Sequence, residues 1–244
     1  MKILSDVQSG KYDRCMLDMY LPDEKNCPVL LFFHGGGLEG GSRKDYSLFG
    51  EIFTKQGIAF VSADYGMYPD CGYPDFLYDG AAAAEYVMRT LTPAGLFIGG
   101  SSAGAYISMM LCFDKKYLGK YGIDSDSLPG YILNAGPPAA HPNVLNRRGL
   151  DRRRVIVDDS SALYHIDRST IAPTLVLVSD NDMFGRLEQN AVMVKTLEHF
   201  ENKNCEFHVI NGYKHCEYDN IIQPGGGTIL TNAAADFIKR RFIR

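Results

Sequence analysis

The chain has 244 residues, of which 45% are hydrophobic and 22% are charged, and its formal net charge is −4. This length and apolar content suffice for one large hydrophobic core, so we expect a single α/β domain over residues 1–244. The negative charge gives no support to nucleic-acid binding, which needs a basic surface. No apolar run approaches the ~18 residues of a membrane-spanning helix, so no membrane partner is expected.

The six cysteines show neither C-x-x-C pairs nor the spacing of a zinc finger. The first four residues lead directly into Ser5 and Asp6, so they contain no apolar secretory region. Together these features predict reduced thiols and a cytoplasmic location. We expect neither a metal site nor a cofactor.

Apolar runs alternate with helical patterns along most of the chain. In chain order, strands are expected at 15–20, 29–33, 58–63, 95–99, 131–134, 174–179 and 205–210, and helices at 47–56, 75–91, 103–113, 186–200 and 228–242. Asp75 and Thr228 are expected to cap the helices that they begin. Because wholly apolar strands are buried on both faces, the pattern predicts a mostly parallel central sheet flanked by helices.

One stretch, residues 135–171, interrupts this alternation. It has no clear strand, it contains the adjacent prolines Pro137 and Pro138, and it carries five arginines between Arg147 and Arg154. Long excursions within a compact domain usually have a function, and we expect a small cap or a substrate-side loop here. The arginine cluster is either a solvated face or an attractor for an anionic substrate or partner.

The sequence Gly-Ser-Ser-Ala-Gly at residues 100–104 follows an apolar strand and precedes a helix. In this setting the G-x-S-x-G pattern predicts a sharp turn with Ser102 as a nucleophile at its tip. Such a turn leaves no room for side chains two residues before or after the serine, and Gly100 and Gly104 provide that room. In a chain with 25 glycines the pattern alone is weak evidence, so its expected partners matter.

The first partner is His34-Gly35-Gly36-Gly37, directly after the strand at 29–33. Acyl transfer builds negative charge on a carbonyl oxygen, which preorganised backbone N–H groups stabilise. We predict that the N–H groups of Gly36, Gly37 and Ala103 form this oxyanion hole. His34 is expected to brace the loop rather than to act chemically.

An acid and a histidine complete the predicted site. The strand at 174–179 leads into Asp180-Asn181-Asp182, and we predict Asp182 as the acid with Asp180 as the alternative. His215 follows the strand at 205–210 and is predicted as the base. The chain order serine, acid, histidine is that of the α/β-hydrolases and differs from the chymotrypsin and subtilisin orders.

These motifs together resemble the hormone-sensitive-lipase-like esterase group of α/β-hydrolases, close to small bacterial esterases described as feruloyl or acetyl-xylan esterase-like. The resemblance extends from about Leu17 onward. It differs in Gly66, where many relatives carry arginine after the Asp-Tyr pair. The residues that carry it are His34 to Gly37, Asp64, Tyr65, Tyr73, Pro74, Asp79, Gly100 to Gly104, Tyr164 to Ile166, Pro173, Asp182 and His215.

The resemblance implies a serine carboxylesterase that hydrolyses small-acyl or aromatic esters through an acyl-enzyme on Ser102. The expected partner is a small-molecule ester, with carbohydrate-linked esters among the candidates. A serine amidase or peptidase-like hydrolase, for example of the arylformamidase type, is the alternative function. A protein of this fold that only binds is a third hypothesis.

A further alternative comes from the glycine loop itself. Residues 35–40 also match G-x-G-x-x-G, and Asp64 ends the next strand about where a ribose-binding acid belongs, as in a nucleotide-dependent oxidoreductase. That motif requires a helix to open at the glycines. Gly40, Gly41 and Ser42 disfavour a helix there, so we expect it only near Ser47 and regard this function as the less favoured one.

Overall fold

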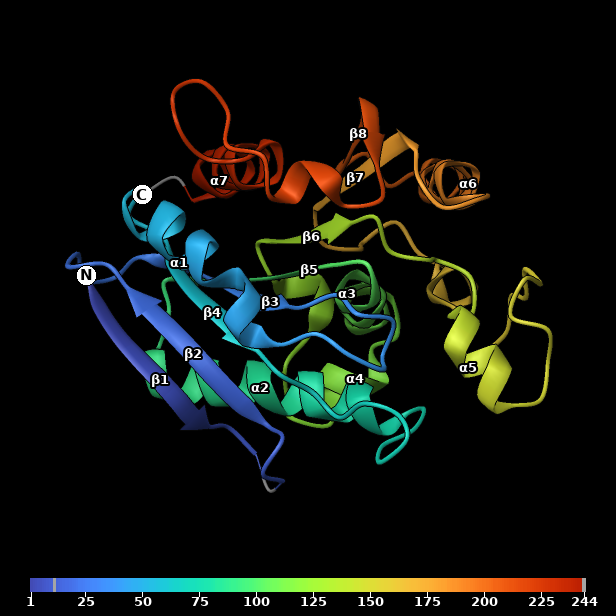
Figure 1. Cartoon of the computed structure of the whole chain (residues 1–244), viewed down its shortest axis with the longest axis horizontal. Coiled ribbons are helices and arrows are strands. Elements are labelled where there is room, and N and C mark those ends of the chain that lie inside the picture. The colour runs from blue at the N-terminus through green and yellow to red at the C-terminus, as the bar shows by residue number, and fades with distance from the viewer. Residues whose placement is uncertain (11, 243–244) are drawn as a thin grey trace.

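The computed structural model describes residues 1–10 and 12–242, and its centre is one eight-stranded sheet (Figure 1). The strand order is β1-β2-β4-β3-β5-β6-β7-β8. The pairs β1–β2 and β2–β4 are antiparallel, and the remaining pairs are parallel. The strands are β1 Lys2–Gln8, β2 Met16–Leu21, β3 Pro28–Phe33, β4 Ala59–Ala63, β5 Gly95–Ser101, β6 Gly130–Asn134, β7 Thr174–Asn181 and β8 Cys205–Lys214.

Helices pack on both faces of this sheet (Figure 1). Helices α1 and α7 share a core cluster on one face, and α2, α3, α4 and α6 contribute to the cluster on the other. The helices are α1 Ser47–Thr54, α2 Asp75–Leu91, α3 Ala103–Phe113, α4 Lys116–Gly119, α5 Pro142–Arg147, α6 Arg186–His199 and α7 Ile229–Arg241. The predicted α/β architecture is therefore confirmed.

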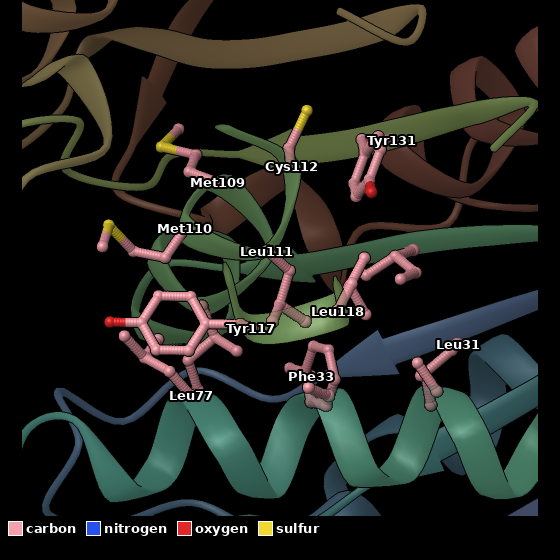
Figure 2. Packing of buried hydrophobic residues seen from close by; sticks show 14 of the residues in the cluster. Leu31, Phe33, Leu77, Met109, Met110, Leu111, Cys112, Tyr117, Leu118 and Tyr131 are labelled. Atoms are coloured by element: carbon pink, nitrogen blue, oxygen red, sulfur yellow. The ribbon is translucent and has the colours of Figure 1, made fainter. Parts of the chain in front are cut away.

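The sequence of β3 is apolar without interruption because both faces of this strand are buried. Leu31 and Phe33 belong to the cluster beneath α2, and Leu30 and Phe32 to the cluster beneath α1 and α7. Figure 2 shows Leu31 and Phe33 directed toward α2, with Leu77 of that helix directed back toward the sheet. Each such side chain contributes roughly 1.5–3 kcal/mol when fully buried, so both faces of the strand stabilise the fold.

The predicted elements differ from the observed ones mainly at the edge strand β1 and at the ends of helices. The sequence did not predict strand β1, because its residues are mostly exposed and its apolar residues Ile3, Leu4 and Val7 do not alternate regularly with polar ones. The prediction that Asp75 caps α2 was wrong, since the cap position is Pro74 and Asp75 is the first helical residue. Thr228 does cap α7, with its side chain accepting a 3.1 Å hydrogen bond from the Thr231 N–H.

The excursion at residues 135–171 contains no strand and holds α5 and a short 3₁₀ turn at Ala162–His165. It leaves the sheet after β6 and lies to the right of it in Figure 1. Of the five arginines, three form ion pairs that hold this segment, to Glu39, Asp158 and Asp151. Carboxylates therefore pair with three of the five positive charges of the cluster.

An arginine from an unexpected part of the chain pairs with Asp79 of α2. Arg14, in the loop before β2, places Nε 3.1 Å from Asp79 Oδ2, and the Gly66 N–H donates to the same oxygen at 2.9 Å. A Cβ atom on Gly66 would lie 2.3 Å from Arg14 Nε. Gly66 thus leaves the space that the Arg14 side chain occupies, and the ion pair at this position comes from Arg14.

Within residues 1–10 and 12–242, no helix is both long enough and apolar enough to cross a membrane. The cytoplasmic location stays a prediction from the sequence. The predicted domain of residues 1–244 also includes Lys11 and residues 243–244, which lie outside the described residues.

Candidate active site

Ser102 lies at a sharp turn between β5 and α3. Its backbone angles are φ 55° and ψ −113°, which are unfavourable for a residue with a side chain. The turn is held in part by the Ser102 N–H, which donates a 2.8 Å hydrogen bond to the carbonyl of Asn134 at the end of β6. The serine side chain therefore stands at the carboxyl edge of the sheet, beside the N-terminus of α3.

The glycines on either side of Ser102 are required by close backbone contacts. A Cβ atom on Gly104 would lie 1.9 Å from the carbonyl oxygen of Phe33, and one on Gly100 would lie 2.4 Å from the Gly104 carbonyl carbon. No side chain of any size fits at either position. The spacing of the G-x-S-x-G motif is thus explained by the contact of α3 with β3 and β5.

His215 bridges Ser102 and Asp182. Its Nε2 atom lies 2.8 Å from Ser102 Oγ, and its Nδ1 atom lies 2.6 Å from Asp182 Oδ1. Asp182 directly follows β7 and His215 directly follows β8, two parallel neighbours whose carboxyl ends lie together. The structure therefore brings together the three residues that the sequence predicted.

Asp182 is held as an ionised acceptor. Burial alone would raise its pKa, but the hydrogen bond and charge of His215 outweigh this effect, so the pKa lies below its usual value. Its side chain is 1% exposed and also accepts hydrogen bonds from the Met183 N–H and Ser179 Oγ. An ionised Asp182 favours the tautomer with the proton on His215 Nδ1, which leaves Nε2 free to accept a proton from Ser102.

The alternative acid, Asp180, does not contact His215. It is exposed, and its Oδ1 atom accepts a 2.8 Å hydrogen bond from the Gly212 N–H. This contact joins the end of β7 to β8 and does not involve His215.

The glycine loop after β3 offers free backbone donors. Gly36 and Gly37 have φ values of 116° and 67°, and the Gly36 carbonyl closes a tight turn by accepting from the N–H groups of Glu39 and Gly40. In the described part of the chain, the N–H groups of Gly36, Gly37 and Ala103 donate to no acceptor. These three groups are available to a substrate oxygen, as an oxyanion hole requires.

His34 is buried and contacts this loop. It is fully buried, its Nδ1 atom lies 2.6 Å from the Gly35 carbonyl oxygen, and its ring stacks on Tyr65 with centroids 4.4 Å apart. The Tyr65 hydroxyl donates to the His34 carbonyl at 2.9 Å. Burial lowers the pKa of His34, which keeps the imidazole neutral and fits a bracing position.

The excursion also contacts the glycine loop, which the sequence did not reveal. Asn143 of α5 donates a 2.6 Å hydrogen bond to the Gly37 carbonyl, and Arg147 pairs with Glu39 at 3.3 Å. Asn143 lies 106 residues from Gly37 and belongs to no motif, so no sequence signal could have identified this contact. The segment that we predicted as a cap therefore holds the loop beside Ser102.

A cavity of about 320 Å³ opens beside the candidate triad. Its lining combines apolar surface with polar groups, which include two carboxylates, Asp45 and Asp219, besides Ser102 and His215. Gly37 and Ala103 are not part of the lining. The residues that line it are Gly35, Gly36, Gly41, Asp45, Tyr46, Ser101, Ser102, His215, Cys216, Asp219 and Asn220.

The geometry around residues 35–40 does not fit a dinucleotide site. The glycines lead into a 3₁₀ turn at Arg43–Tyr46, and the first α-helix begins at Ser47. The glycines therefore do not open the helix that follows them in the chain, as a dinucleotide motif requires. Asp64 is paired with Arg43 rather than free to bind a ribose. Across residues 1–10 and 12–242, no group of three or more His, Cys, Asp or Glu side chains could hold a metal ion.

Comparison with known families agrees with this fold. The family described as alpha/beta hydrolase fold matches residues 30–219, and the chain belongs to it. This match confirms the α/β-hydrolase resemblance that the sequence motifs indicated.

Among individual proteins, the chain is similar to two esterases over less than half its length. It is 34% identical over 105 residues to versiconal hemiacetal acetate esterase of Aspergillus parasiticus, covering 42% of this chain and 33% of that protein. It is 35% identical over 115 residues to gut esterase 1 of Caenorhabditis briggsae, covering 46% of this chain and 17% of that protein. The chain thus spans a third or less of the length of these relatives.

Solved structures share the fold over almost the whole chain. A truncated carbohydrate esterase from gut microbiota superposes with a TM-score of 0.79 at 16% identity, covering 99% of this chain and 96% of that one. Esterase Est2 of Thermogutta terrifontis, with propionate bound, gives a TM-score of 0.75 at 17% identity, covering 98% and 92%.

The contact of α3 with β3 predicts the effect of a single added methyl group. We expect Gly104→Ala to lower the free energy of unfolding by about 3 kcal/mol, because its Cβ would overlap the Phe33 carbonyl. The matched control is Gly119→Ala in α4, where a Cβ meets nothing within 4 Å and the change should stay within about 0.5 kcal/mol. Urea unfolding measures both, and equal stability of the two variants would contradict the close contact.

Proposed function

We propose that the protein is a serine carboxylesterase that hydrolyses small-acyl or aromatic esters through an acyl-enzyme on Ser102. The observation that carries the proposal is the bridging position of His215, 2.8 Å from Ser102 Oγ and 2.6 Å from Asp182 Oδ1. A serine hydroxyl is a weak nucleophile until an adjacent base accepts its proton. This geometry supports proton transfer from Ser102 to His215 and stabilisation of the resulting imidazolium by Asp182.

The mechanism has two steps, acylation of Ser102 and hydrolysis of the acyl-enzyme. Ser102 Oγ attacks the ester carbonyl while His215 Nε2 takes its proton, and the charge on the carbonyl oxygen is held by the N–H groups of Gly36, Gly37 and Ala103. Each such donor is worth about 3–4 kcal/mol in the transition state. His215 then gives its proton to the departing alcohol. A water molecule then attacks the acyl carbonyl while His215 takes its proton. The bond to Ser102 Oγ breaks, His215 returns that proton to Oγ, and the carboxylic acid leaves.

The cavity supports a small substrate. Its volume of about 320 Å³ lies at the lower end of the roughly 300–1,000 Å³ of ligand pockets. The exposed carboxylate of Asp45 in its lining would lose water contacts beside a long alkyl chain, which could not pair with it. The polar side chains in the lining, such as Tyr46 and Asn220, could hydrogen-bond an alcohol that carries hydroxyl groups, so carbohydrate-linked esters belong to the proposed substrate class.

The similar proteins described above are all esterases, which adds support to this proposal. Amide hydrolysis is the second candidate, because the same serine, histidine and oxyanion donors can attack an amide. It demands efficient protonation of a poor leaving group by His215. Parallel assays with formamide substrates therefore belong to the first experiment.

The first prediction concerns the nucleophile. Ser102→Ala removes the attacking oxygen and should lower kcat for p-nitrophenyl acetate by about 10³-fold or more without unfolding the protein. Initial rates of the wild type and the variant, with circular dichroism as the control for folding, provide the measurement. Retained hydrolysis in the variant would exclude Ser102 as the nucleophile, and a wild type that cleaves only formamides would favour the amidase function.

The second prediction separates the two candidate acids. Asp182→Asn should lower kcat by about 10³- to 10⁴-fold, because an amide cannot orient His215 and stabilise its positive form in the same way. Asp180→Asn is the matched control, since Asp180 accepts a hydrogen bond from the Gly212 N–H rather than from His215, and it should leave kcat nearly unchanged. The opposite ranking of the two variants would assign the acid to Asp180.

The third prediction concerns acyl length. Because the cavity is small and lined by carboxylates, p-nitrophenyl acetate should give a higher kcat/KM than the butyrate, and the octanoate should give the lowest value. The three esters share one leaving group, so their rates report on acyl binding alone. A preference for octanoate would place the acyl chain outside this cavity.

A further inference from the structure

A second carboxylate lies beside the candidate triad, and the mechanism above does not use it. Asp219 belongs to the 3₁₀ turn Glu217–Asp219, four residues after His215, and it is 4% exposed. It lines the same cavity as Ser102 and His215. A buried carboxylate is costly unless hydrogen-bond donors surround it.

Both donors to Asp219 come from the ends of the central strands. Ser101 Oγ donates to Asp219 Oδ2 at 2.8 Å, and Asn134 Nδ2 lies 3.0 Å from each carboxylate oxygen. Tyr218 adds a parallel contact, since its hydroxyl donates to Asn134 Oδ1 at 2.5 Å. The turn that follows His215 is thus joined by its side chains to the ends of β5 and β6.

The same two residues also contact Ser102 through the backbone. Ser101 is the residue before Ser102, and the carbonyl of Asn134 accepts the Ser102 N–H at 2.8 Å. Asp219 therefore connects the turn that carries His215 to the turn that carries Ser102. A shift of either turn would change the contact between His215 Nε2 and Ser102 Oγ.

The segment between His215 and Asp219 is short and internally bonded. The Asp219 N–H donates to the Cys216 carbonyl at 3.1 Å, and the Lys214 N–H donates to the Glu217 carboxylate at 2.9 Å. Because the turn is short and hydrogen-bonded, a displacement of Asp219 would also displace His215. Burial raises the pKa of Asp219 to about 7 even though Ser101 and Asn134 donate hydrogen bonds to it. The ionised carboxylate is therefore unfavourable for stability at this position. This cost points to a role for Asp219 in activity rather than in folding.

We propose that Asp219 is a positioning residue for ester hydrolysis, whose hydrogen bonds to Ser101 and Asn134 hold the His215 turn against the Ser102 turn. The inference rests on the proposed function. Its physical effect is to preserve the contact through which the Ser102 proton passes to His215. Reacting groups displaced by about 1 Å can lose 10²-fold in rate.

The test compares Asp219→Ala with the conservative variant Asp219→Asn. Asp219→Ala should lower kcat for p-nitrophenyl acetate by about 10- to 10²-fold with KM nearly unchanged. Asp219→Asn should recover most of kcat, because its amide oxygen can accept from Asn134 and its amide nitrogen can donate to Ser101. Asp236→Asn, at an exposed position on α7, is the matched control and should match the wild type.

Two results would overturn the proposal. A folded Asp219→Ala variant with the wild-type kcat would show that the contact does not position His215. An Asp219→Asn variant as slow as Asp219→Ala would show that negative charge, rather than the hydrogen-bonded link, is what matters. Should Asp219→Ala fail to fold, Ser101→Ala tests the same link from the other side and should also lower kcat.

A second measurement does not depend on turnover. The proton between His215 Nδ1 and Asp182 should give a low-field proton NMR signal in the wild type and in Asp219→Asn, and this signal should shift or disappear in Asp219→Ala. An unchanged signal in Asp219→Ala would contradict the proposal. If the wild type hydrolyses no ester, the proposed function fails, while this comparison still decides whether Asp219 positions His215.

Discussion

The contact between the start of α3 and the end of β3 is the constraint on which the site depends. Helix α3 lies so close to the Phe33 carbonyl that residue 104 cannot carry even a methyl group. This contact forces the chain to turn sharply at Ser102, with a positive φ that few residues adopt. The energy stored in that turn is offset by the packing of the wholly buried helix α3.

The remaining parts of the site come to Ser102 because they follow parallel strands. The glycine loop follows β3, Asp182 follows β7 and His215 follows β8, so all three leave the same edge of the sheet. Parallel pairing fixes this edge without any contact between the side chains themselves. The short distances around His215 then refine an arrangement that the topology has already produced.

Buried charge pairs hold the loops that the sheet alone leaves free. Arg43, 6% exposed, pairs with Asp6, Asp18 and Asp64 and so fixes the chain directly after the glycine loop. A guanidinium with this many carboxylate partners is well compensated, whereas the loss of Arg43 would leave the buried Asp18 without its cation. Asn143 holds the other side of the same loop from α5. The loop is therefore fixed from both sides.

The sequence by itself determined the α/β architecture and the identity of the candidate site residues. Apolar runs such as 29–33 mark strands buried on two faces, and the glycines around Ser102 report a local backbone geometry that only they permit. Local signals of this kind can be read from neighbouring residues. The sequence also indicated both Asp180 and Asp182, which lie two positions apart at the end of β7.

Only the tertiary structure decided which contacts those residues make. The choice between Asp180 and Asp182 depends on the course of the loops after β7 and β8, which places Asp182 on His215 and Asp180 on Gly212. The links from Arg14 to Asp79 and from Asp219 to Ser101 join residues 65 and 118 positions apart. Such pairs form no periodic pattern or motif, because their geometry arises only when the packed elements bring distant segments together.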